Sequence, residues 1–128
     1  MDKAILLIDT DLGFLFWLGQ ALDRAGYEAF PARGISDAIA LLAALHLTVG
    51  SVILNYSLPG AENFIADLRR SQNHLKVISL VEYEQQFIPP GIDAVFCKPA
   101  EINERSRAEL VQMVQKVVAS AIPQILVT

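Results

Sequence analysis

The stretch Ser51-Val52-Ile53-Leu54-Asn55-Tyr56-Ser57-Leu58-Pro59-Gly60 decides the fold. Its short apolar run, Val52 to Leu54, ends at the polar residue Asn55, and a Leu-Pro-Gly turn follows. This pattern is typical of a buried strand that stops at the edge of a sheet. In open parallel α/β sheets the ligand crevice lies outside the carboxyl ends of the strands, so Asn55 is the first candidate for a functional side chain.

Strand-like and helix-like segments alternate along the rest of the chain. Short apolar runs predict further strands at residues 4–8, 27–32, 77–81 and 94–97. Helices are predicted at residues 12–25, at 36–45 with Ser36 as its cap, in a short segment after Gly60, and from Ser106, which forms a capping box with Glu109, to Pro123. The alternation predicts a doubly wound α/β sandwich with a five-stranded parallel sheet. Pro31 lacks a backbone donor, which places its strand at an edge.

The composition fits one compact domain. Of the 128 residues, 53% are hydrophobic and 19% are charged, which suffices for one core. No apolar run reaches the length of a membrane span, and a net charge of -4 without a basic cluster argues against nucleic-acid binding. The segment around Asp2 and Lys3 has no signal-peptide features, so we expect a cytoplasmic protein. The single cysteine, Cys97, lies in an apolar run and is expected to be buried.

The helix predicted at residues 12–25 has an apolar stripe that should pack on the sheet. At 100° per residue Phe16 points away from this stripe, with Leu12 nearby and Leu15 at its margin. Such residues are usually isolated exposed side chains, but together they also have the composition of a partner surface. Leu12, Leu15 and Phe16 are therefore candidates for an interaction surface, and both interpretations stay open.

Two more predicted strands end in polar landmarks: Asp9 follows the strand at 4–8, and Lys98-Pro99 follows the strand at 94–97. Together with the turn at 55–60 they resemble, in order, the landmarks of two-component response-regulator receiver domains (CheY-like), from Lys3 to about Ala119. The resemblance implies a flavodoxin-like (βα)5 fold with strand order 2-1-3-4-5. It implies a receiver-like domain over residues 1–121, with 122–128 as a tail or the start of a linker.

The candidate site departs from the receiver pattern at its reactive positions. Asn55 stands where receivers have the phosphoacceptor Asp, and an amide cannot attack a phosphoryl donor as a carboxylate does. Thr10 replaces one of two acids that hold magnesium in receivers, so Asp9 should bind Mg²⁺ weakly if at all, and no cofactor is expected. Asp11, a further remnant of that site, is expected to cap the following helix, with metal ligation as the alternative. Lys98 matches the lysine that pairs with the phosphorylated Asp, and we expect it to form an ion pair with Asp9 instead.

The positions that transmit the signal in receivers depart as well. Val81 stands where a Thr or Ser receives the phosphoryl oxygen, unless the strand slides and places Ser79 there. Val95 stands where a Tyr or Phe rotates on activation. The segment 81–91 has room for about a turn and a half less helix than receivers have. The connection 99–106 is about five residues longer than a β-to-α connection requires.

These departures favour a pseudo-receiver, a binding module in two-component signal transduction that works without phosphorylation and is not an enzyme. Its partner would be a signalling protein such as a histidine kinase or an output domain, with no direct contact to nucleic acid or membrane, and a homodimer is left open. Two alternatives remain: a receiver that is phosphorylated on another acid, and a small-ligand sensor that uses the remodelled crevice.

Overall fold

The computed structural model describes residues 3–72, 74–83 and 89–119. Its elements follow one another as β1 (Ala4–Ile8), α1 (Leu12–Arg24), β2 (Glu28–Ala32), α2 (Ile35–Leu45), β3 (Ser51–Asn55), α3 (Ala61–Ser71), β4 (Lys76–Val81), β5 (Ala94–Cys97) and α4 (Glu104–Ala119). All strand pairs are parallel, and the order β2-β1-β3-β4-β5 is the predicted one. The predicted domain boundary at 121 and the helix end at Pro123 lie outside the described residues.

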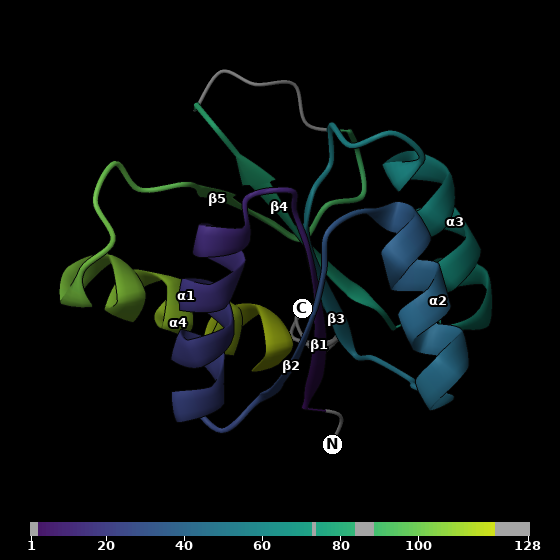
Figure 1. Ribbon diagram of the computed structural model, residues 1–128, viewed down its shortest axis with the longest axis horizontal. Helices are drawn as coiled ribbons and strands as arrows, with labels where there is room; N and C mark the ends of the chain where they lie inside the picture. Colours follow the sequence, from purple (N-terminus) through teal and green to yellow (C-terminus); the bar gives the residue numbers. More distant parts are fainter. Residues whose placement is uncertain (1–2, 73, 84–88, 120–128) are drawn as a thin grey trace, which may run out of the picture.

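The sheet lies between two layers of helices (Figure 1). Helices α1 and α4 cover one face, and α2 and α3 cover the other. Strand β1 is buried along its whole length because both of its faces are covered. Strand β2 lies at the edge, where Pro31 aligns with Leu7, which confirms the edge prediction. Among the described residues, no helix is both long and apolar enough to cross a membrane.

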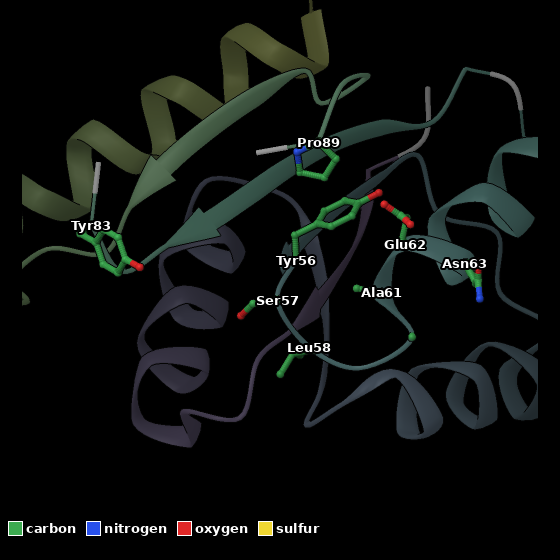
Figure 2. Close-up of a pocket in the computed structure, with 9 residues that line it drawn as sticks. Tyr56, Ser57, Leu58, Ala61, Glu62, Asn63, Tyr83 and Pro89 are labelled. Atoms are coloured by element: carbon green, nitrogen blue, oxygen red, sulfur yellow. The ribbon is translucent and has the colours of Figure 1, made fainter. Parts of the chain in front are cut away.

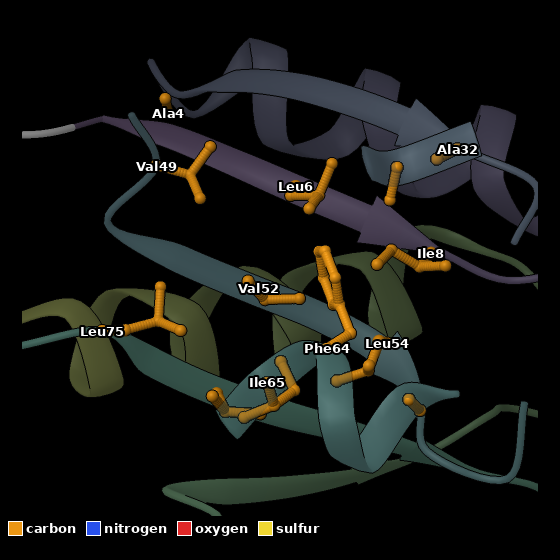
Figure 3. Packing of buried hydrophobic residues seen from close by; sticks show 13 residues of the cluster. Ala4, Leu6, Ile8, Ala32, Val49, Val52, Leu54, Phe64, Ile65 and Leu75 are labelled. Atoms are coloured by element: carbon orange, nitrogen blue, oxygen red, sulfur yellow. The ribbon is translucent and has the colours of Figure 1, made fainter. Parts of the chain in front are cut away.

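The core is divided in two by the sheet, because successive side chains of a strand point to opposite faces. Phe64 and Ile65 of α3 pack on the strand residues of one face (Figure 3). The strand residues of this first face are Ala4, Leu6, Ile8, Ala32, Val52, Leu54 and Val77. On the second face, α1 and α4 pack on Ile5, Leu7, Ile53, Ile78, Leu80 and Phe96. The strand ends that form the candidate site are thus fixed from both sides.

Two helices begin earlier than predicted. Helix α2 begins at Ile35 with Gly34 at the cap position, so the prediction of Ser36 as the cap is wrong. Helix α4 begins at Glu104, before Ser106. The cap is an exchange in which the Asn103 N–H donates to Ser106 Oγ at 2.9 Å and the Ser106 N–H donates to Asn103 Oδ1 at 3.0 Å. The predicted capping box of Ser106 with Glu109 is therefore wrong, because the side chain of Asn103, and not that of Glu109, accepts the hydrogen bond from the Ser106 N–H.

The segment between β4 and β5 contains no helix in its described residues, 82–83 and 89–93, where a shortened one was predicted. This leaves the outer face of β5 without a described helix over it. Phe96 points to the opposite face and is buried among residues packed with α4, whereas Val95 and Cys97 are exposed. The prediction of a buried Cys97 is wrong because an apolar run alone does not tell which face of an edge strand is covered.

The exposed apolar surface of α1 contains fewer residues than predicted. Leu12 is exposed and Phe16 is 69% exposed, but Leu15 is only 3% exposed and belongs to the core shared with α4. Because α4 packs beside α1 as well as on the sheet, the buried face of α1 is wider than its sheet-facing stripe. Leu15 is therefore removed from the predicted interaction surface.

Candidate functional site

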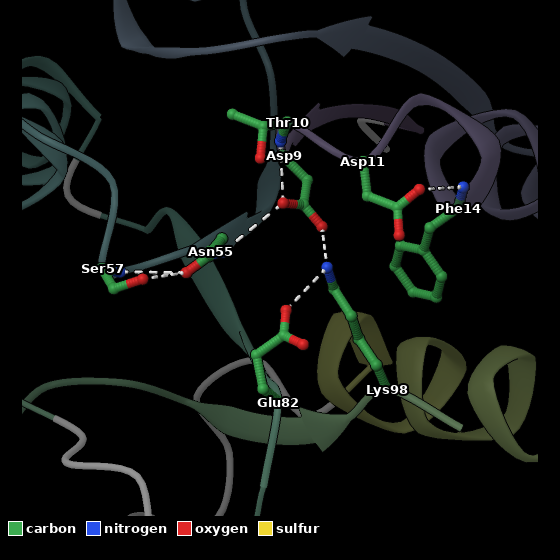
Figure 4. Close-up of polar contacts among 8 residues, drawn as sticks. All are labelled: Asp9, Thr10, Asp11, Phe14, Asn55, Ser57, Glu82 and Lys98. Atoms are coloured by element: carbon green, nitrogen blue, oxygen red, sulfur yellow. Dashed lines mark hydrogen bonds and ion pairs between the residues drawn. The ribbon is translucent and has the colours of Figure 1, made fainter. Parts of the chain in front are cut away.

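The candidate site lies at the carboxyl edge of the sheet, where four strands deliver polar side chains. Asn55 is the last residue of β3, and Asp9, Glu82 and Lys98 directly follow β1, β4 and β5. Figure 4 shows the four side chains converging. Parallel pairing brings these strand ends to one edge, so residues far apart in sequence form one polar cluster.

The centre of the cluster is an ion pair between Lys98 Nζ and Asp9 Oδ2. The Asp9 side chain is 1% exposed and that of Lys98 is 12% exposed, so the charges are largely withdrawn from water. The ammonium also lies 5.1 Å from the centre of the Phe14 ring, within the range of a cation–π interaction. The predicted pairing of Asp9 with Lys98 is confirmed.

The other carboxylate oxygen of Asp9 is held by two weaker partners. The backbone N–H of Thr10 donates to Asp9 Oδ1 at 2.8 Å, and Asn55 Nδ2 donates to the same oxygen at 3.4 Å. The Thr10 side chain is exposed, and Asp11 caps α1 as predicted, accepting from the Phe14 N–H at 3.1 Å. Thr10 and Asp11 thus frame the loop after β1, and Asp9 alone supplies a buried carboxylate among the described residues.

Asn55 has its amide fixed in one orientation. Its Oδ1 accepts from the Ser57 N–H at 3.1 Å and from Ser57 Oγ at 2.6 Å, while its Nδ2 points at Asp9. The amide therefore joins the turn after β3 to the buried carboxylate. Because it is an amide, it presents no anionic oxygen at the end of β3.

Glu82 is the site residue that the sequence analysis missed. Its Oε2 lies 3.2 Å from Lys98 Nζ, and its side chain is 59% exposed. The argument that singled out Asn55, that functional side chains lie at the carboxyl ends of parallel strands, also applies to Glu82. Glu82 directly follows the apolar run of β4, as Asp9 follows that of β1. Burial by itself would lower the pKa of Lys98. The hydrogen bonds and attraction from Asp9, and then from Glu82, outweigh burial and raise the pKa of Lys98 above its ordinary value.

The two predicted switch positions lie next to the cluster without joining its polar contacts. Val81, the last residue of β4, is buried and aligned with Cys97, and Val95 is exposed on β5. Ser79, the alternative position on β4, is fully buried, and its Oγ has no hydrogen-bond partner within the described parts of the chain. Its register neighbours are Leu54 and Val95, so it lies in the sheet interior, away from Lys98.

A magnesium ion does not fit this set of side chains. Mg²⁺ requires oxygen ligands and usually at least one free carboxylate. Here the ammonium of Lys98 occupies Asp9 Oδ2 and also faces Glu82, while Asn55 Oδ1 is used by Ser57. Within residues 3–72, 74–83 and 89–119, no group of three or more His, Cys, Asp or Glu residues could hold a metal ion.

An open pocket of about 570 Å³ lies beside the cluster, between the turn after β3 and the chain after β4 (Figure 2). Tyr56 points across it toward Glu62, and Tyr83 borders its other side. Burial and the nearby Glu62 carboxylate raise the pKa of Tyr56, so its hydroxyl stays protonated at neutral pH. The pocket therefore offers hydroxyl groups, aromatic surface and the Glu62 carboxylate, and no cation among its described lining.

No family model matches the chain, and no curated protein matches it. Solved structures do match. The response regulator TrrA from Thermotoga maritima is 23% identical with a TM-score of 0.69, covering 90% of this chain and 98% of its own. The chemotaxis response regulator CheY4 of Vibrio cholerae is 20% identical with a TM-score of 0.68, covering 89% and 99%. A CheY-like receiver domain from Methanospirillum hungatei is 19% identical with a TM-score of 0.71, covering 92% and 94%. TrrA has also been solved in complex with the histidine kinase ThkA. The chain therefore has the receiver-domain fold over nearly its whole length.

Proposed function

We propose that this chain is a pseudo-receiver: a protein-interaction module of two-component signalling that uses the receiver fold without phosphorylation and without catalysis. The observation that supports this most is Asn55. It stands at the strand end where a receiver has its phosphoacceptor, and its amide is engaged by Ser57 and Asp9. A carboxamide in this position cannot form an acylphosphate.

The contacts of Lys98 support the same proposal. In a receiver, this lysine pairs with the phosphorylated Asp. Here its ammonium is already paired with the buried carboxylate of Asp9 and with Glu82. Because these contacts need neither a metal nor a phosphoryl group, the site keeps one arrangement, and binding would depend on the surface of the domain alone.

The proposed partner is a signalling protein such as a histidine kinase or an output domain, in a cytoplasmic setting. Leu12 and Phe16, exposed at the start of α1, are the proposed contact residues. They lie on the helix that directly follows the Asp9 loop, on the same edge of the sheet as the cluster. Exposed apolar side chains grouped in this way favour a protein partner over nucleic acid, which would require Lys and Arg. The alternative partner is a second copy of the chain, with which it would form a homodimer.

The test is exposure of the protein to Mg²⁺ and a small phosphodonor, followed by intact-mass measurement. We expect no added phosphoryl mass under conditions that label a receiver with an intact phosphoacceptor. A phosphoryl adduct on the wild-type chain that hydroxylamine removes, as it removes an acylphosphate, would overturn the proposal, and peptide mapping would then identify the acid that carries it.

The pocket beside Tyr56 makes small-ligand sensing the second candidate function. Chemical-shift mapping of ¹⁵N-labelled protein with a panel of uncharged nucleosides and sugars tests it. Saturable shifts at residues 56–63 would favour this function over a purely protein-binding one.

A further inference from the structure

Glu82 makes a contact that the receiver pattern does not assign to it. It directly follows β4, and its Oε2 lies 3.2 Å from Nζ of Lys98, on the opposite side of the ammonium from Asp9 (Figure 4). An ammonium group has three donors, so it can serve two carboxylates at once. Lys98 thus joins the end of β1 to the first residue of the segment that connects β4 to β5.

We propose that Glu82 is an internal substitute for the phosphoryl group: it gives Lys98 its second anionic partner and so fixes residues 82–83, the first after β4, against the site. This inference rests on the proposed function, in which Asn55 carries no phosphoryl group. It assigns to Glu82 a positioning role, because Glu82 acts on the segment through Lys98 and on no reacting atom.

The exposures of the two acids explain why Glu82 and not Asp9 has this role. Asp9 is 1% exposed and belongs to the interior of the site, where it would remain whatever else bound Lys98. Glu82 is 59% exposed and approaches from solvent, as an added anion would. An exposed ion pair contributes little to stability, so a competing anion can displace Glu82 without unfolding the site.

The place of Glu82 in the chain gives the contact a structural consequence. Residue 82 is the first after β4, and the described residues 82–83 and 89–93 form no helix. Because no helix sets the direction of these described parts, their placement depends on specific contacts. At the far end the Asp93 carboxylate accepts from the Val77 N–H at 2.8 Å and pairs with Arg69 at 3.4 Å. Glu82 supplies the corresponding contact at the near end.

The test is competition between Glu82 and a phosphoryl mimic. In a variant with Thr10→Asp and Asn55→Asp, Mg²⁺ and beryllofluoride are titrated by NMR with and without Glu82→Gln. We expect Glu82→Gln to tighten beryllofluoride binding by up to about fivefold, which corresponds to the upper end of the range for losing one exposed ion pair. Glu101→Gln is the matched control, since Glu101 is an exposed acid three residues after Lys98 on the same edge of the sheet. It should leave the affinity unchanged.

A third substitution distinguishes two ways in which Glu82 could weaken beryllofluoride binding: by pairing with Lys98, or by repelling the anion through its negative charge alone. With Lys98→Met present, Glu82→Gln should no longer change beryllofluoride affinity. An equal gain from Glu101→Gln, or a gain that persists with Lys98→Met, would overturn the inference.

A second measurement uses the wild-type chain and Glu82→Gln alone. It tests the role of Glu82 even if the variant with Thr10→Asp and Asn55→Asp does not bind beryllofluoride. ¹³C NMR of the Lys98 side chain should give a lower pKa in Glu82→Gln than in the wild-type chain, and backbone shifts should change through residues 89–96. An unchanged Lys98 pKa would overturn the inference and leave the proposed function intact. A phosphoryl adduct on the wild-type chain would instead overturn the proposed function.

Discussion

Replacing Lys98 with Met removes the cation from a buried carboxylate. The Asp9 side chain is 1% exposed, and without Lys98 its Oδ2 loses its ion pair. Breaking a buried pair by removing one partner costs about 3–5 kcal/mol. Two hydrogen bonds to Oδ1 remain, from Thr10 and Asn55, and Lys98 is itself 12% exposed. We therefore expect Lys98→Met to lower the free energy of unfolding by a smaller amount, about 2–3 kcal/mol.

The assay is urea denaturation of Asp9→Asn, Lys98→Met and the double variant at neutral pH. Asp9→Asn keeps an acceptor for the Thr10 N–H and removes the charge. The two substitutions should show a coupling energy of about 1 kcal/mol or more, because each removes the same pair. As a control, Arg69→Met breaks the pair with Asp93, in which the side chains are 33% and 31% exposed, and should cost less than about 1 kcal/mol. Additive effects of the two site substitutions, within about 0.5 kcal/mol, would refute the reasoning.

The same pair predicts a pH dependence. The pKa of Lys98 is raised in the folded state, so the folded chain holds this proton more tightly than the unfolded chain. The stabilisation is fully present at neutral pH and is lost as the pH rises through the folded-state pKa, above about pH 10. The stability difference between the wild-type chain and Lys98→Met should therefore shrink at alkaline pH. A difference that stays constant up to that range would contradict the assignment.

Three further predictions concern the core, the sheet and the metal. Leu15→Ala should lower the free energy of unfolding by about 2–4 kcal/mol, whereas Phe16→Ala, one residue along α1, should change it by less than about 0.5 kcal/mol; equal effects in urea denaturation would contradict the burial difference. Ser79→Ala should raise the free energy of unfolding by about 1 kcal/mol, since it removes a buried hydroxyl without a partner in the described structure; a loss of stability would indicate a hydrogen bond to that hydroxyl. Thr10→Asp with Asn55→Asp should gain magnesium binding, because the site then has a set of carboxylates; an NMR titration with no Mg²⁺-dependent shifts near residues 9–11 would exclude this.

The strand order and the location of the site were predictable because both follow from the positions of apolar runs and their ends. Asp9, Asn55 and Lys98 each follow or end such a run, and parallel pairing brings them to one edge. The contact between Asp9 and Lys98 could be expected because, with a neutral amide at Asn55, Asp9 was the nearest expected anion. These predictions required only the order of elements along the chain.

The errors concern surfaces that depend on what another element covers. Leu15 is buried because α4 packs beside α1, and Cys97 is exposed because the described chain places no helix over the outer face of β5. Periodicity identifies the faces of an element but not its neighbours. Glu82 was missed for a different reason: the receiver pattern assigns no acid to that position, and only its place directly after the apolar run of β4 points to it.

Two departures from the receiver pattern, Val81 and Val95, lie on the neighbouring strands β4 and β5. They determine how a site with a restored phosphoacceptor should behave. In receivers a hydroxyl on the fourth strand and an aromatic ring on the fifth move together when the Asp is phosphorylated. The positions predicted to correspond in this chain are Val81, which is buried, and Val95, which is exposed on β5. Neither side chain can accept or donate a hydrogen bond to a phosphoryl group. A ligand shifts a conformational equilibrium only by its different affinity for the two states. An anion bound to the carboxylate that Asn55→Asp restores would compete with Glu82 for Lys98 and so affect the start of the chain after β4. Val81 and Val95 give that anion no hydrogen bond or ring through which it could favour a second state of α4. Restored chemistry should perturb residues 9–11, 55–60 and 98, and leave 107–119 unchanged in NMR spectra, whereas large shifts through α4 would show that another route connects the site to that helix.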